Sequence, residues 1–140
     1  MKIAALAVAN TAFLHLKGPD GVPLYEDNKP IGIDLFSPGT PEAAQVESRR
    51  SARAIKRMQD NDNKVSIPPI KQQRIEVAED LTALTSGFRG VDYDDVDGQP
   101  LAGAALYSAV YSDPKLGWIK DQVVKFQADW GKFTPGSAGI

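Results

Sequence analysis

The sequence predicts a single α+β domain, in which a small antiparallel β-sheet from about the first 36 residues packs against about four α-helices. The 140 residues match the usual size of one domain. Apolar residues form 42% of the chain and charged residues 24%, values typical of a folded globular protein. Short β-prone runs come first and helix-period segments follow, an order that indicates an α+β fold.

Residues 11–36 alternate β-prone runs with turn residues. The runs are 11–16, 22–25 and 31–36, and the turns are GPDG at 18–21 and DNKP at 27–30. Glycine and asparagine supply the positive φ angles that hairpin turns need, and proline fixes the turn entry. We therefore expect two hairpins or a three-stranded meander, with Ile33 and Leu35 on the buried face.

Residues 1–10 read MKIAALAVAN and form an apolar start. The stretch is shorter than the roughly 15 to 30 residues of a secretory signal and the roughly 20 of a membrane span. No apolar run elsewhere approaches membrane length. We expect a buried first strand or an ordered arm here, and no membrane association.

Residues 40–131 carry the helical part. Thr40, Pro41 and Glu42 predict a capped helix that runs to about Gln59, exposed over most of its circumference because its apolar stripe is narrow. Residues 60–64 then form a loop. A second helix is expected to begin at 66–69 and to end near Gly87. Its apolar positions recur at mostly helical spacing: Ile67, Ile70, Val77, Leu81, Leu84 and Phe88.

The C-terminal third predicts two more helices after a turn-rich acidic connection at 91–100. A short helix is expected over 101–111, with Leu106 and Val110 on one face. A last helix begins at Asp113-Pro114 and stops near Gly131. The tail 134–140 is small and glycine-containing, so we expect it to be mobile.

Catalytic and metal-binding patterns are missing from the sequence. The chain has no cysteine, which excludes disulfides and thiolate chemistry, and its one histidine, His15, has no nearby partner. The acidic segment 92–97 fails the calcium-loop pattern, because Tyr93 and Ala104 fall where ligands belong. It is read as a solvated loop, with a weak cation site as the alternative. We expect no enzyme, no cofactor and no metal, and nominate no catalytic residue.

Charge is segregated along the chain, although the net charge is only −2. Residues 49–57 hold five basic side chains and no acid, whereas residues 76–97 hold seven acids and one arginine. The basic helix has three interpretations: a solvated face, a face for an acidic protein partner or second copy, or a nucleic-acid contact. Net acidity and the lack of base-reading side chains argue against nucleic acid.

Several motifs together resemble one known family. A GPDG turn precedes PLYEDNKP at 23–30, a basic helix begins in SPGTPE at 37–42, and LTALTSGF occupies 81–88. The remaining motifs are DGQPL at 97–101, Asp113-Pro114, Trp118-Ile119 and Phe133. Over residues 13–133 the chain resembles the tail assembly chaperones of long-tailed, siphovirus-type bacteriophages and prophages. Its apolar start is a departure from that family.

The resemblance implies a non-enzymatic late protein that binds the tape-measure protein and keeps it soluble during tail tube assembly. It implies the host cytoplasm, absence from the mature virion, and the tail tube protein as a second candidate partner. It also places Leu101, Leu106, Trp118 and Phe133 in the core. Because individual binding residues are undefined by the family motifs, we choose the basic helix as the contact surface: Arg49, Arg50, Arg53 and Arg57.

Alternatives remain open. One is a structural neck or tail-terminator component that uses its arms to bind neighbours, and another is a nucleic-acid-binding regulator that uses the basic helix. Self-association through the apolar start at residues 1–10 is a further expectation.

Overall fold

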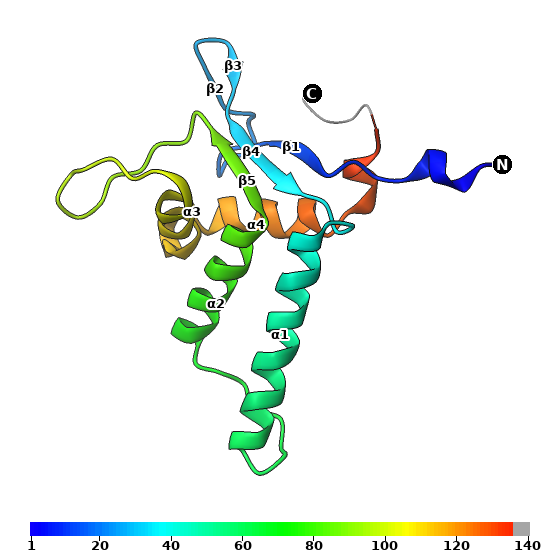
Figure 1. Cartoon of the computed structure of the whole chain (residues 1–140). Coiled ribbons are helices and arrows are strands. Elements are labelled where there is room, and N and C mark those ends of the chain that lie inside the picture. The colour runs from blue at the N-terminus through cyan, green and yellow to red at the C-terminus, as the bar shows by residue number, and fades with distance from the viewer. Residues whose placement is uncertain (136–140) are drawn as a thin grey trace.

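The computed structural model describes residues 1–135 and shows an α+β fold (Figure 1). Its main sheet is antiparallel and has the order β1 (Thr11–His15), β4 (Gly32–Phe36), β5 (Thr85–Arg89). Strands β2 (Tyr25–Glu26) and β3 (Lys29–Pro30) form a separate small hairpin. The helices are α1 (Pro41–Asp60), α2 (Ile70–Ala83), α3 (Gly103–Ser112) and α4 (Gly117–Gln127). Helices α1 and α2 project from the body as a helical hairpin.

The predicted N-terminal sheet is confirmed, but its pairing differs from a simple meander. Strand β1 pairs directly with β4. The run 22–25 folds back on residues 16–18 through an isolated bridge between Pro23 and Lys17, and its last residue, Tyr25, begins β2. That hairpin turns at Asp27 and Asn28, whose φ angles of 50° and 62° are the positive values expected there. The central strand β4 buries Ile33 and Leu35 completely, as the alternation predicts.

The third strand of the main sheet, β5, corrects the prediction that the second helix ends near Gly87. Helix α2 ends at Ala83, and the Leu84 carbonyl accepts a hydrogen bond from the Phe36 amide. The Thr85 hydroxyl bonds the Leu81 carbonyl and the Tyr111 hydroxyl, both at 2.7 Å. Strand β4 would otherwise present an unpaired edge, and pairing with β5 satisfies its backbone groups.

The start of the second helix also differs from prediction. Helix α2 begins at Ile70 and has no side-chain cap. Pro68 and Pro69 follow each other, and a residue before proline is disfavoured in helical conformation, so residues 66–69 stay outside the helix. Ile67 and Ile70 are consequently 80% and 64% exposed, although the apolar spacing predicts them in the core.

The apolar start at residues 1–10 is an exposed arm. Residues Ile3–Leu6 form a 3₁₀ turn, and the side chains of Ile3 and Leu6 are 72% and 59% exposed. The arm joins the body where the Ala9 amide bonds the Phe133 carbonyl at 2.7 Å, and it projects away beyond that point (Figure 1). Of the two predicted alternatives, the structure shows the arm and not the buried first strand, because no strand forms before Thr11.

Helix α1 confirms its prediction closely. The Thr40 hydroxyl accepts a hydrogen bond from the Ala43 amide at 3.3 Å, Pro41 opens the helix, and the helix ends at Asp60. Val46 is its one buried residue. Such a helix cannot be held by apolar packing along its length.

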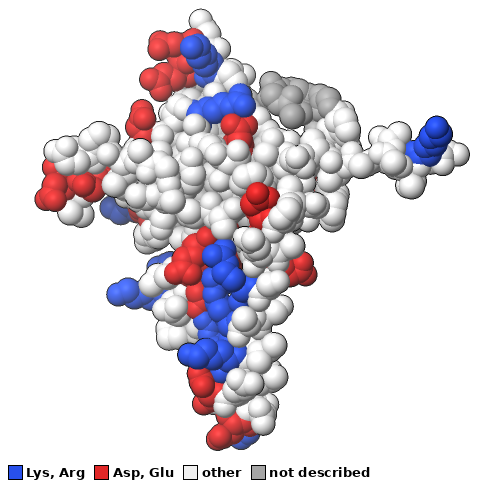
Figure 2. Space-filling view, viewed as in Figure 1, with Lys and Arg blue, Asp and Glu red and all other residues white. Residues whose placement is uncertain are grey.

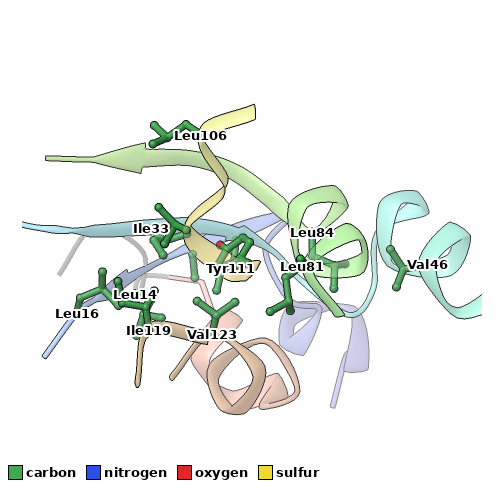
Figure 3. Close-up of a cluster of buried hydrophobic side chains, with 14 of the residues drawn as sticks. Leu14, Leu16, Ile33, Val46, Leu81, Leu84, Leu106, Tyr111, Ile119 and Val123 are labelled. Atoms are coloured by element: carbon green, nitrogen blue, oxygen red, sulfur yellow. The ribbon is translucent and has the colours of Figure 1, made fainter. Parts of the chain in front are cut away.

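The core lies between the sheet, the C-terminal half of α2, and helices α3 and α4 (Figure 3). Leu106 and Phe133 are buried, and Leu101 and Trp118 pack against the core while partly buried, as the resemblance implies.

The last helix is shorter than predicted. Asp113 caps a 3₁₀ turn at Pro114–Leu116, and α4 ends at Gln127. Of the predicted mobile tail, residues 136–140 lie outside the described residues.

Candidate partner-binding surface

Helices α1 and α2 face each other through charged side chains. Arg50 Nε lies 3.1 Å from Asp80 Oδ2, and Arg53 donates to both Asp80 oxygens at 3.0 and 2.9 Å. Arg57 bonds Glu76. We call this set the charge seam, and it appears as a blue and red column along the hairpin in Figure 2. Its members are Arg49, Arg50, Arg53, Arg57, Glu76, Glu79 and Asp80.

Contacts within the charge seam shift the pKa values of two of its members, Arg53 and Glu76. Asp80 is only 3% exposed, and its hydrogen bond raises the pKa of Arg53 despite partial burial. Burial opposes ionisation of Glu76, but hydrogen bonds from Gln72 and Arg57 outweigh it and lower the pKa of its carboxyl. A buried carboxylate needs such partners, because leaving its charge unpaired costs several kcal/mol (about 3 or more).

All four predicted contact residues lie in the charge seam. The structure brings these four arginines together, but each of them also lies within ion-pair distance of an acidic side chain of α2. The basic face is therefore only partly available to a partner. Arg49 lies 3.9 Å from Asp80 and Arg53 lies 3.3 Å from Glu79, which adds to the pairing. Many of the basic residues of 49–57 are therefore paired with acidic residues of 76–80 in the same chain. That these arginines touch a partner stays a prediction.

A groove of about 380 Å³ runs beside the charge seam. Its apolar lining comes from Ile67, Pro68 and Val77, and its polar lining includes Arg50, Arg53 and Arg57. Because acids on α2 neutralise these guanidinium groups, the groove does not present three free cations. The aliphatic parts of the arginine side chains add apolar surface to the lining of this groove. We call this feature the tip groove.

Large apolar side chains crowd the distal end of the hairpin. Val65, Ile67 and Ile70 are 84%, 80% and 64% exposed, and we call these three residues the hairpin tip. Single exposed apolar residues are ordinary, whereas here three large ones lie within six positions on a projecting element. Lys64, Lys71 and Arg74 surround the tip, and within residues 1–135 none of them forms an ion pair.

Sequence reasoning missed the tip because Ile67 and Ile70 fit the helical spacing of core residues. The signal that could have found it is the Pro68-Pro69 pair, which separates Ile67 from the helix and leaves Ile70 in its first turn.

The other sequence candidates have local structural roles. His15 Nε2 lies 2.8 Å from the Leu24 carbonyl oxygen, and its ring packs edge-on against Tyr25. In the acidic segment, the Asp95 carboxylate accepts the amides of Asp97 and Gln99 at 2.8 and 2.9 Å and so closes a turn. Over the described part of the chain, no group of three His, Asp or Glu side chains is placed to hold a metal ion.

Comparison with known proteins finds no matching family model, no matching curated protein and no matching solved structure. Among the helices of residues 1–135, none is long and apolar enough to cross a membrane. A functional proposal therefore rests on the fold and on the surfaces described above.

Proposed function

We propose that this chain is a tail assembly chaperone of a long-tailed, siphovirus-type bacteriophage or prophage. It binds the tape-measure protein and keeps it soluble while the tail tube assembles around it. It works in the host cytoplasm by binding alone, without catalysis or a cofactor, and leaves before the virion is complete. The observation that carries the proposal is the hairpin tip, an apolar surface on a hairpin whose own contact is polar.

The chemistry of the tip suits a long apolar client. Tape-measure chains are long, helical and apolar, and an exposed apolar stripe aggregates unless another surface covers it. A helix can lay such a stripe along an apolar groove, and the tip groove with Ile67, Pro68 and Val77 supplies one. The client segment that fits is an amphipathic helix.

The expected affinity is modest. Burying one valine or isoleucine side chain contributes about 1.5 to 3 kcal/mol. Three such residues contribute about 4.5 to 9 kcal/mol. The cost of association, about 4 to 15 kcal/mol, offsets most of this gain. A client held this weakly can be handed over to the growing tube. Lys64, Lys71 and Arg74 would speed encounter with acidic client segments without adding much affinity.

Substituting the hairpin tip should abolish chaperone activity. With Ile67→Asp and Ile70→Asp combined, the co-expressed tape-measure protein of the same genome should move from the soluble to the insoluble fraction, because charge replaces the apolar contact. The matched control is Val96→Asp, since Val96 is also a β-branched apolar residue and is fully exposed elsewhere. Solubility is measured by quantitative gel after centrifugation.

The double variant should keep its circular dichroism spectrum and melting temperature, because both side chains are exposed. The proposal fails if unaltered protein does not solubilise the tape-measure protein. The assignment to the tip fails if the double variant works as well as the control.

A structural neck or tail-terminator component is the second candidate, and the exposed arm at Ile3–Leu6 favours it. Such a component would use the arm to bind a neighbour in a ring. Mass spectrometry of purified particles separates the two functions, because a structural component is present in every particle and a chaperone is absent. A nucleic-acid role gains no support, since the predicted phosphate contacts lie in the charge seam.

A further inference from the structure

Strand β1 forms the edge of the main sheet opposite β5 (Figure 1). In an antiparallel pair the backbone groups of successive residues point alternately toward the partner strand and away from it. The Leu16 amide donates to the Ile31 carbonyl at 3.0 Å, so the even-numbered residues of this stretch face β4. The backbone N–H and C=O groups of the odd-numbered residues therefore point outward from the sheet: Thr11, Phe13 and His15.

The two ends of this outward edge are closed by hydrogen bonds. At one end the Ala9 amide donates to the Phe133 carbonyl at 2.7 Å. At the other end the Gln122 side-chain amide accepts from the Lys17 N–H at 2.9 Å and donates to the Lys17 carbonyl at 2.8 Å, as a neighbouring strand would.

Between these ends the edge is open. Within residues 1–135, no hydrogen bond joins the outward backbone groups of Thr11, Phe13 and His15 to another residue. Phe13 is only 5% exposed, and backbone groups on so buried a residue are rarely left without a partner. The open edge therefore presents three donors and three acceptors in the repeat of an extended chain.

A groove of about 660 Å³ lies beside the open edge. One side of the groove comes from β1 and the turn that follows it, and the other side comes from α4 and the residues after it. We call it the edge groove, and its lining includes Leu14, His15, Lys17, Trp118, Lys125 and Phe126. A strand edge beside a partly apolar helix face is the arrangement by which many domains bind extended peptides.

Strand β1 also lacks the features that protect exposed strand edges. Proteins block such edges with charged residues, proline or a bulge. The strand reads TAFLH, without lysine, arginine, acid or proline, and its pairing with β4 is regular. The opposite edge strand, β5, carries Gly87 and Arg89 and a register shift against β4. Of the two edges, that of β1 is therefore the one suited to accept another strand.

We propose that the edge groove binds an extended segment of a partner protein, which adds to β1 as a further strand of the main sheet. The alternating donors and acceptors of the open edge match an extended backbone. They do not match a helix, because a helix bonds its own backbone groups internally. Every second side chain of the segment points toward α4, where apolar residues pack on Trp118 and Phe126.

Charge in the edge groove favours a segment that also carries an acidic residue. Lys17 and Lys125 are exposed, and within residues 1–135 neither forms an ion pair. The two acids of the groove already have partners, because Asp121 lies 3.8 Å from Lys120 and Asp129 caps the 3₁₀ turn that follows α4. A carboxylate of the bound segment then complements the two free ammonium groups.

Peptide selection tests the chemistry of the segment. A random library of linear twelve-residue peptides is selected on the immobilised full chain, and the enriched peptides should carry apolar residues at every second position and an acidic residue. In fluorescence anisotropy, Lys17→Glu combined with Lys125→Glu should weaken binding of an enriched peptide at least about tenfold. Lys120→Glu, on the same helix but outside the groove, is the matched control and should change the affinity less than about twofold.

Backbone pairing is tested on the same peptide and protein. N-methylation of alternate peptide amides should weaken binding at least about tenfold in one phase and less than about twofold in the other, because only one set of amides faces β1. By NMR, the amides of Thr11, Phe13 and His15 should exchange faster than that of Leu14 in the free protein. Peptide binding should slow these three at least about tenfold and leave Leu14, already paired with β4, unchanged.

Three results overturn the proposal. Slow exchange at all three outward amides of the free protein would show that the N-terminal arm or a second copy already covers the edge. Equal effects of the two N-methylation phases would exclude strand addition. Failure to enrich peptides, or equal binding to the Lys17→Glu and Lys125→Glu double variant, would exclude the groove. The hairpin-tip variant with Ile67→Asp and Ile70→Asp should bind the peptide normally, so the proposed client binding can fail without affecting this result.

Discussion

Replacing Gly32 with alanine should destabilise the fold by more than about 3 kcal/mol. Gly32 lies in the central strand β4, and a Cβ there would sit 2.0 Å from the Leu14 carbonyl oxygen and 2.4 Å from the Phe13 ring. Neither neighbour can yield, because Leu14 belongs to the paired strand β1 and Phe13 is buried. Urea unfolding followed by circular dichroism measures the change.

The matched control is Gly87→Ala in the neighbouring strand β5. Nothing lies within 4 Å of a Cβ at that position, so its free energy of unfolding should change by less than about 1 kcal/mol. Equal effects at the two glycines would show that β4 does not lie against β1 as described.

Removing the Asp80 carboxylate should be the second most damaging change. Asp80→Ala leaves Arg50 and Arg53 without their shared acceptor and should lower the free energy of unfolding by about 2 to 3 kcal/mol. The value is below that of a fully buried pair because side-chain exposure is 56% for Arg50 and 22% for Arg53. Urea unfolding again provides the measurement.

Glu79→Ala is the control on the same turn of α2. Its side chain is 57% exposed and makes one 3.3 Å contact with Arg53, so the loss should stay below about 1 kcal/mol. If Asp80→Ala were as mild as this control, the charge seam would not hold α1 against α2.

Local signals made parts of this fold predictable from the sequence. Thr40 and Pro41 mark the start of α1 because capping depends only on adjacent residues. Asp27 and Asn28 mark a turn for the same reason. Strand β5 could not be predicted in this way, because Leu84 and Phe88 have helical spacing. Their actual environment comes from distant partners: Phe36 bonds Leu84, and Tyr107 and Tyr111 pack on Phe88.

In the candidate site too, some features follow from local sequence and others depend on distant partners. The arginines of α1 were identifiable as one basic face, since helical spacing places them together. Their pairing with Asp80 depends on how α1 and α2 align across a loop, which no local pattern specifies. The tip could not be predicted from periodicity, because Ile67 and Ile70 have the spacing of core residues although helix α2 begins only after Pro68 and Pro69.

Hydrogen exchange of the protein, alone and with its tape-measure protein, tests the central claim most directly. The claim is that the distal end of the α1–α2 hairpin is the client-binding surface. Amides of residues 64–77 should exchange at least about tenfold more slowly in the complex, while those of the acidic loop at 91–100 stay unchanged. Protection confined to the acidic loop or the main sheet, with none at 64–77, would contradict the account.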